Sequence, residues 1–525
     1  MTTTAPADRT RVRWSGRPDA DAWWFWGPAT FALVAILARN TWIFRRHVYE
    51  HGDAALISIM VQNSHHGAVL TGPVSRVGFP HPGPAYIYVV SAGQSLVHDW
   101  LPLTASAYGG QFAGAAVLQA VLFGLVVRVL VRLTGSARAG WIGGAIVFWF
   151  EASHRMLGET WLPYLYTSAF ALLVIAMIAV AAGRTRELAA LVLAGGLLAH
   201  GHVAFLMFVG ISWLAAGLAW WFQHRGGARA ELARERRSVL VAAGLLALFA
   251  VPLVAEVVLH YPGPWPDYLS YQGARHGRSV GTCLDFFGHF WADSYPGWLV
   301  PIAVLAGAVA WRLDPDRDRR RRWLIGYGVL ALQSGLFLVY IVRGIDVLAP
   351  VNYYTGWFYE TVPMFLLVLP AVQLALLVPA RWTGPRLAGR VLPLAAVVVV
   401  AAGAASPALT EVNPDNPSVA PLLSALVNDP DRGGRTIVLR FDRDRWSLMA
   451  SIVAEGKRRG VPICVADPYW RGLFTPSAIC SDPAAGWAVA SQAPGDYTGG
   501  HAVIWADVGE VVYEGVRPNL PPDQR

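Results

Sequence analysis

Long apolar runs constrain the fold of this chain more than any other feature of its sequence. A run of about 20 apolar residues is long enough for one helix to cross the hydrocarbon core of a bilayer. Short clusters of arginine separate the runs. The pattern predicts an α-helical polytopic membrane protein with about eleven transmembrane helices. The predicted spans are 23–44, 108–131, 139–154, 161–182, 188–201, 203–222, 238–259, 298–311, 323–342, 357–379 and 391–406.

Composition and charge agree with a membrane protein. Hydrophobic residues make up 55% of the chain and charged residues only 14%, against about 25% charged in a typical soluble domain. The net charge of +8 comes from basic clusters between apolar runs, which is how cytoplasmic loops of membrane proteins look. A nucleic-acid site would instead gather basic residues on one face. We therefore expect membrane lipid, and no nucleic acid, as a partner.

The arginine distribution predicts the topology. The first run leads to Arg45 and Arg46 without a small-residue cleavage site, so we expect an uncleaved anchor with residues 1–22 in the cytoplasm. If the broken apolar segment 82–97 does not cross the membrane, the N-terminus and the loops between the predicted helices place 23 arginines in the cytoplasm and 7 outside, without counting the domain after residue 407. If it crosses, most arginines lie outside, against the positive-inside rule. We predict a multi-pass plasma-membrane protein with a transmembrane domain over 23–406 and a long outer loop over 45–107.

Two segments of this outer loop have helical character. Apolar and polar residues alternate at roughly helical spacing from Asp53 to His66, and Pro82 to Val97 is apolar but interrupted by glycine and proline. Both fit helices that lie in the membrane interface. Backbone at this depth must be satisfied by protein or trapped water, so such segments normally line a cavity.

The composition changes near residue 407 and predicts a small extracytoplasmic α/β domain over 407–525. An amphipathic helix is expected over Ser447–Arg459, among five short β-rich runs. Cys464 and Cys480 could form a disulfide in this outer domain, or could be two buried thiols. The β-rich runs are 436–440, 462–466, 486–490, 501–507 and 510–515.

Candidate site residues are ionisable groups near the outer ends of the predicted helices. Such groups at membrane depth are functional candidates by default. Asp53 and Glu50 are three residues apart, and a pair of acids suits a general base or a divalent cation. Asp53 could equally cap a helix that starts at Ala54. In the same loop, Arg76 and His81 could bind a phosphate group.

Further candidates are spread over the later outer loops. Glu256 lies within an apolar run, where an unpaired carboxylate is costly. Glu151 and Arg155 could form a site or a simple ion pair on one helix face. The remaining candidates are Glu159, His200, His202, Arg343, Asp346, Asn352, Tyr353 and Tyr354. The sequence contains no Walker A loop, G-x-G-x-x-G fingerprint or H-E-x-x-H motif, which argues against a nucleotide-driven ATPase.

The stretch GDAALISIMVQNSHHGAVLTGPVSRVGFPHPGPAYIY at 52–88 resembles the first-loop signature of GT-C glycosyltransferases. Weaker similarity to actinobacterial proteins of this group lies in WLPYLYT at 161–167, PLVAEVVLHYPGP at 252–264 and CVADPYWRGLFTP at 464–476. The resemblance implies an inverting enzyme that transfers a sugar from a polyprenyl-phosphate donor to an extracytoplasmic glycan, lipid or protein of the cell envelope. It also implies that Asp53 is the catalytic acidic residue of the first loop, acting as the base.

The spacing Glu50-x-x-Asp53 differs from the acidic pairs common in that superfamily, such as D-D or E-x-D, so the resemblance leaves open whether a metal ion binds. On this interpretation the donor phosphate and sugar contact Arg76, His81 and Arg343, with Glu256, Glu151, Arg155 and Glu159 as further candidates. Two other functions remain consistent with the sequence. One is a non-catalytic envelope assembly protein with the same fold, and the other is a lipid or sugar transporter, although we find no repeated halves.

Overall fold

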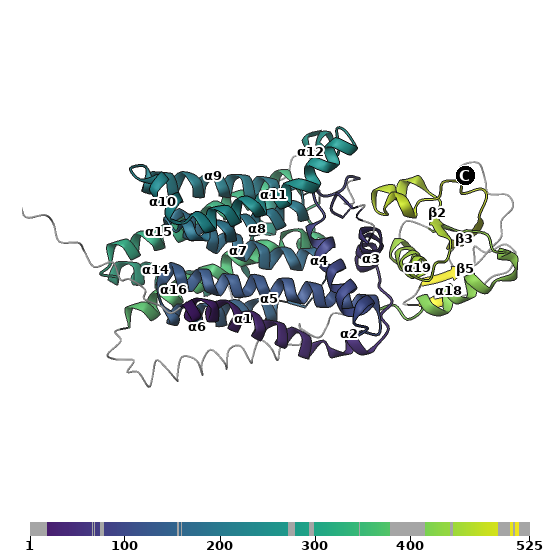
Figure 1. The fold of residues 1–525 in the computed structure, drawn as a ribbon, viewed down its shortest axis with the longest axis horizontal. Helices are drawn as coiled ribbons and strands as arrows, with labels where there is room; N and C mark the ends of the chain where they lie inside the picture. Colours follow the sequence, from purple (N-terminus) through teal and green to yellow (C-terminus); the bar gives the residue numbers. More distant parts are fainter. Residues whose placement is uncertain are drawn as a thin grey trace, which may run out of the picture.

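The structure is a computed structural model that describes residues 18–65, 67, 69–73, 78–154, 157–158, 160–270, 279–292, 299–345, 347–378, 415–441, 445–491, 505–507 and 510–513. The larger part is a bundle of helices that run roughly side by side, and a smaller α/β part lies beyond one end of this bundle (Figure 1). The predicted fold class, a polytopic helical membrane protein with a small C-terminal α/β region, is confirmed.

Ten of the eleven predicted apolar runs coincide with helices within the described residues, and the helices over 228–234, 265–270 and 280–292 were not among the predicted spans. The bounds of the bundle helices are α1 (Pro18–Arg39), α2 (Thr41–Arg45), α5 (Ala107–Thr134), α6 (Ala137–Ser153), α7 (Leu162–Ala181), α8 (Leu188–Gly201), α9 (Phe205–His224), α10 (Ala228–Arg234), α11 (Arg236–Leu259), α12 (Trp265–Ser270), α13 (Val280–Ala292), α14 (Leu299–Leu313), α15 (Arg317–Arg343), η3 (Pro350–Glu360) and α16 (Thr361–Leu377). Seven helices of the described chain are long and apolar enough to cross a membrane. The predicted spans α6, α8 and α14 are helical but shorter, and the predicted span 391–406 lies outside the described residues.

Burial explains why these helices are apolar all round. The apolar window of α7 is entirely buried by its neighbours, whereas that of α11 is only 6% buried. A helix in the centre of the bundle packs apolar side chains against other helices. A helix at the edge presents similar side chains outward, as expected where the surrounding medium is lipid.

Ion pairs tie the helix ends together on the side away from the α/β part. Asp21 of α1 binds Arg128 of α5 at 2.7 Å, and its second oxygen binds Nε of Arg132 at 2.7 Å. Arg132 also binds Glu187, in the turn before α8, at 3.1 Å. These groups lie at helix ends that the arginine count assigns to the cytoplasm, where charged side chains meet water and lipid headgroups.

Both helices predicted in the outer loop are present. They are α3 (Asp53–Ser64) and α4 (Ala85–Gln94), and π-helical residues Ser95–Trp100 continue α4. Figure 1 shows α3 between the bundle and the α/β part. Ile57 and Val61 of α3 belong to the core of the bundle, and Ala55 and Ile59 belong to the core of the α/β part. Protein therefore packs against α3 on two sides, which differs from the surface helix that the sequence suggested.

The C-terminal part contains α18 (Val419–Asn428), α19 (Trp446–Arg458) and a sheet of five strands in the order β2-β1-β3-β5-β4. Strand β1 pairs in parallel with β2 and β3, and β5 pairs antiparallel with β3 and β4. Cys464 and Cys480 form a disulfide, and Cys283 is a buried free thiol. The strand bounds are β1 (Ile437–Arg440), β2 (Ile463–Val465), β3 (Trp487–Ser491), β4 (Trp505–Asp507) and β5 (Glu510–Tyr513).

Candidate functional site

A cavity of about 730 Å³ lies where α3, the α8–α9 turn, the end of α15 and the C-terminal part meet. Three predicted site residues line it: Asp53, His81 and Arg343. Asp53 and His81 come from the same outer loop, 45–107, and Arg343 comes from the end of α15, far away in the sequence. Aromatic and apolar side chains form most of the remaining wall, and Leu473 is contributed by the C-terminal part. A mostly apolar cavity with a few convergent polar groups is typical of a ligand site.

Asp53 is the first residue of α3, and its carboxylate is held by an indole. The residue before it, Gly52, has φ +56° and occupies the N-cap position, and this helix start has no side-chain cap. The alternative in which Asp53 caps α3 is therefore not what the structure contains. Trp161 donates a hydrogen bond from Nε1 to Oδ2 of Asp53 at 2.8 Å. A carboxylate at a helix N-terminus is further favoured by the helix dipole.

The PHPGP turn at 80–84 is fixed by packing that only glycine permits. The backbone N–H of Gly83 donates to the carbonyl of His200 at 3.1 Å, and an added Cβ at Gly83 would come within 2.2 Å of the His200 ring. The backbone N–H of His81 donates to Pro73, and Tyr268 of α12 donates its hydroxyl to Pro80. Glycine at 83 thus lets two outer segments approach closely enough to place His81 in the cavity wall.

His81 lies against a second histidine, His202, in the turn between α8 and α9. The two ring centroids are 4.2 Å apart, and both side chains line the cavity. Burial lowers the pKa of His202 to about 4. Burial and the neighbouring His202 hold the pKa of His81 well below its usual value. Both imidazoles are therefore neutral near pH 7.

Arg343 and an aromatic cluster complete the polar wall. Arg343 is the last residue of α15, where a cation is favoured by the carboxyl-terminal end of the helix dipole. The ring of Trp161 lies 5.3 Å from that of Tyr354 and 5.5 Å from that of Trp357. Trp161 and Tyr354 face the cavity. Aromatic faces of this kind provide apolar contact surface, with N–H and O–H groups at the ring edges.

Glu50 occupies a different environment from Asp53. Its buried carboxylate forms an ion pair with Arg458 of α19 and accepts a hydrogen bond from Ser58 at 2.9 Å. Burial by itself lowers the pKa of Arg458, but the Glu50 carboxylate outweighs it and raises that pKa. Glu50 is not among the residues that line the cavity. Its position favours a role in holding α3 rather than in the chemistry predicted for it.

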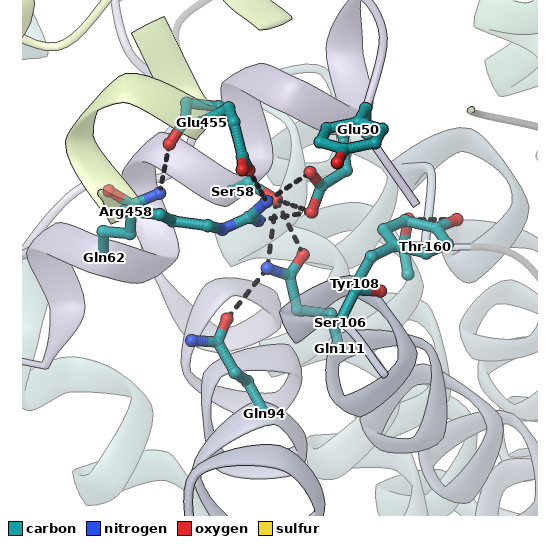
Figure 2. A network of polar contacts seen from close by, with 12 residues as sticks. Glu50, Ser58, Gln62, Gln94, Ser106, Tyr108, Gln111, Thr160, Glu455 and Arg458 are labelled. Carbon is teal, nitrogen blue, oxygen red and sulfur yellow. Dashed lines mark hydrogen bonds and ion pairs between the residues drawn. The ribbon is translucent and has the colours of Figure 1, made fainter. Parts of the chain in front are cut away.

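The contacts of Glu50 belong to a larger polar network that joins α3, α4, α5 and α19 (Figure 2). Gln111 of α5 donates to Ser58 of α3 at 3.0 Å and to Gln94 of α4 at 2.9 Å. On the other side of Arg458, Glu455 binds Arg459 at 2.8 Å. The helix that begins with Asp53 is therefore connected by hydrogen bonds and ion pairs to both parts of the molecule.

The remaining predicted site residues do not gather at the cavity. Glu151 is buried at the end of α6, and Glu256 of α11 lies 2.9 Å from Nδ1 of His260, which directly follows that helix. Neither lines the cavity. The predicted residues Arg76, Arg155, Glu159 and Asp346 lie outside the described residues.

No cluster of three or more His, Cys, Asp or Glu side chains that could hold a metal ion occurs within the described part of the chain. Asp53 and Glu50 are the acidic pair considered for a divalent cation. Glu50 forms an ion pair with Arg458, whereas Asp53 lines the cavity. The divalent cation remains an untested expectation.

Comparisons with solved structures identify the architecture. ArnT from Cupriavidus metallidurans in the apo state superposes with a TM-score of 0.57 at 14% sequence identity, over 94% of this chain and 98% of that chain. The chain has the GT-C fold. ArnT from the same organism bound to undecaprenyl phosphate gives a TM-score of 0.56 at 14% identity, over 92% of this chain and 97% of that chain. No model of a known protein family and no curated protein sequence matches the chain.

Several residues of this GT-C cavity were not singled out as site residues by the sequence. Trp161 and Leu473 lie in the segments WLPYLYT and CVADPYWRGLFTP, whose sequences resemble GT-C signatures. This resemblance is the only feature of the sequence that could have pointed to them. His202, in contrast, is one of the candidates that the sequence offers in the later outer loops. Tyr268 and Tyr340 had no signal, because their presence in the wall depends on how α12 and α15 pack.

Proposed function

We propose that the protein is a membrane glycosyltransferase that transfers a sugar from a polyprenyl-phosphate donor to an extracytoplasmic envelope acceptor. The observation that carries this proposal is the convergence of Asp53, His81 and Arg343 on one cavity in a GT-C fold. A solved neighbour with this fold is described with bound undecaprenyl phosphate. Such a displacement needs a base for the acceptor hydroxyl and groups that stabilise the leaving phosphate. Asp53 can act as the base, and Arg343 and His81 can contact the phosphate.

In the proposed reaction the hydroxyl oxygen of the acceptor forms a bond to the anomeric carbon of the sugar. The bond from that carbon to the phosphate oxygen breaks, and the electron pair leaves with the polyprenyl phosphate. Asp53 takes the hydroxyl proton as general base. A single displacement inverts the anomeric configuration.

The residues around Asp53 and Arg343 support this assignment. Trp161 orients the base through its hydrogen bond to Oδ2, and a fixed orientation lowers the entropic cost of reaching the transition state. Arg343 and His81 stand in the same cavity to stabilise the charge that develops on the leaving phosphate. The aromatic faces of Trp161 and Tyr354 offer a surface for the sugar ring.

The test is sugar transfer by the purified full-length protein in lipid, with a panel of radiolabelled polyprenyl-phosphate sugars and an envelope extract as acceptor. We expect Asp53→Asn to reduce transfer by about 100- to 10,000-fold, the range that general base catalysis contributes. The matched control is Asp267→Asn, because Asp267 lies on the neighbouring short helix α12 and does not line the cavity.

Equal transfer by wild type and a correctly folded Asp53→Asn protein would overturn the catalytic assignment. Absence of transfer with every donor and acceptor fraction would favour the non-catalytic assembly role or the transporter.

A further inference from the structure

The α8–α9 turn brings a histidine, a helix N-terminus and a second histidine to one side of the cavity. His202, Val203 and Ala204 lie in the turn before α9, and Met207 lies in the first turn of that helix. All four line the cavity, and His81 lies against His202. Helix α9 has 20 residues, so its N-terminal end carries the partial positive charge of a full helix dipole. The backbone N–H groups of Ala204, Phe205 and Met207 are already hydrogen-bonded within the turn, so the dipole alone, and not a free N–H group, favours an anion at this end.

The hydrogen bonds of His202 fix which nitrogen carries its proton. The backbone N–H of Ala204 donates to Nδ1 of His202 at 3.1 Å. In a neutral imidazole, a nitrogen that accepts a hydrogen bond leaves the proton on the other nitrogen. Nε2 of His202 is therefore the N–H donor, and it has no hydrogen-bond partner among the described residues.

The side chain of His81 provides a second, independent observation at this part of the cavity wall. Its side chain is only 8% exposed, and its Nδ1 atom is buried without a hydrogen-bond partner among the described residues. A buried polar atom left unpaired costs free energy comparable to a lost hydrogen bond. Its backbone is held by hydrogen bonds to the 72–73 segment, so the ring cannot readily leave the wall.

We infer that His202, His81 and the N-terminus of α9 form a phosphate-binding subsite. Arg343 offers the phosphate a formal positive charge, whereas this subsite carries none. This inference rests on the proposed function, because it names groups that receive the phosphate of the lipid donor. The subsite binds through neutral N–H donors and a helix dipole. It therefore adds hydrogen bonds to the phosphate without burying another full charge, which would be costly in a largely apolar cavity.

Two substitutions of His202 distinguish the acceptor role of Nδ1 from the donor role of Nε2. Asparagine places its amide oxygen near the position of Nδ1, so His202→Asn keeps an acceptor for the Ala204 N–H and removes the Nε2 donor. Glutamine places its amide nitrogen near the position of Nε2, so His202→Gln keeps a donor toward the cavity. The matched control is His224→Gln, because His224 lies at the other end of α9, its Nδ1 is 3.0 Å from the carbonyl of Trp220, and it does not line the cavity.

The experiment measures binding to the purified full-length protein in detergent with three probes: undecaprenyl phosphate, undecaprenol and inorganic phosphate. A hydrogen bond to a charged group contributes enough that we expect His202→Asn to weaken undecaprenyl phosphate binding about tenfold or more. We expect its binding of undecaprenol to be unchanged. His202→Gln should stay within about threefold of wild type, and His224→Gln should match wild type.

The three probes also distinguish the source of the phosphate. Tight, His202-dependent binding of undecaprenyl phosphate with weak binding of inorganic phosphate supports a lipid headgroup subsite. Equal His202-dependent binding of both supports a subsite for free phosphate. Unchanged undecaprenyl phosphate binding by His202→Asn at the wild-type melting temperature would overturn the inference, as would an equal loss of undecaprenyl phosphate and undecaprenol.

The outcome is independent of the transfer assay. If the protein binds undecaprenyl phosphate through His202 but transfers no sugar, the phosphate subsite stands and the glycosyltransferase proposal fails. If transfer requires Asp53 but His202→Asn binds normally, the proposed function stands and the subsite fails.

Discussion

At the residue scale, the indole of Trp161 sets the orientation of the carboxylate that we propose as the base. Its Nε1 donates to Oδ2 of Asp53 at 2.8 Å. We expect Trp161→Phe to keep an aromatic ring in the wall but to lower kcat for sugar transfer by about 10- to 100-fold, because a hydrogen bond to a charged group contributes about 1.5–3 kcal/mol. The KM for the donor should change little, since Arg343 and His81 remain. Steady-state kinetics against donor concentration measure both parameters.

Trp213→Phe is the control for that substitution. Trp213 of α9 also donates its indole N–H, to the carbonyl of Leu191 at 3.3 Å, but does not line the cavity. We expect it to leave kcat near the wild-type value. A Trp161→Phe enzyme with wild-type kcat would show that Asp53 is oriented by other contacts.

At the element scale, the position of α3 depends on a buried ion pair with the C-terminal part. Side-chain exposure is 1% for Glu50 and 15% for Arg458. Removing one partner of such a pair leaves a buried charge without compensation, which costs about 3–5 kcal/mol. We therefore expect Arg458→Met to lower the free energy of unfolding by about that amount. Glu50→Gln combined with Arg458→Met should recover much of the loss, because the amide oxygen still accepts from Ser58.

Denaturant unfolding of the four proteins of this cycle, in detergent, gives the coupling energy between the two residues. Arg459→Met is the comparison, because Arg459 is 40% exposed in its pair with Glu455 and an exposed pair contributes about 1 kcal/mol or less. Additive losses in the double variant would mean that Glu50 and Arg458 act separately.

The ion pair of Glu50 with Arg458 could not be predicted from the sequence, although several cavity residues could. Asp53, His81 and Arg343 could be found because each interrupts an apolar pattern near the outer end of a predicted helix. The partner of Glu50 could not be found in this way, because Arg458 is 408 residues away and the sequence around it has the pattern of an ordinary amphipathic helix. Short-range periodicity predicts which segments are helices, whereas pairings across the fold depend on how those helices pack.

At the scale of the whole molecule, hydrophobicity alone accounts for most of the architecture. Apolar runs predicted the helices of the bundle, and the change in composition near residue 407 predicted the separate C-terminal part. The two-sided burial of α3 was not predicted, because an amphipathic segment between two domains has the same pattern as one on a membrane surface. The contribution of Leu473 to the cavity wall likewise depends on how the C-terminal part docks.

The orientation of the molecule in the membrane follows from the arginine count and leads to a prediction for the whole chain. The positive-inside rule places the C-terminal part outside and the α9–α10 connection in the cytoplasm. We expect Ser424→Cys, at an exposed position of α18, to react with a membrane-impermeant maleimide in intact cells. Arg225→Cys, exposed just after α9, should react only after the membrane is permeabilised.

The native cysteines give little background in this measurement. Cys464 and Cys480 are joined in a disulfide, and Cys283 is buried. Labelling of Arg225→Cys but not Ser424→Cys in intact cells would invert the topology and place the cavity on the cytoplasmic side. There, nucleotide-activated sugars are available and a lipid-linked donor is not required. The labelling pattern therefore tests the membrane orientation, and with it a physical reason for the proposed lipid-phosphate donor.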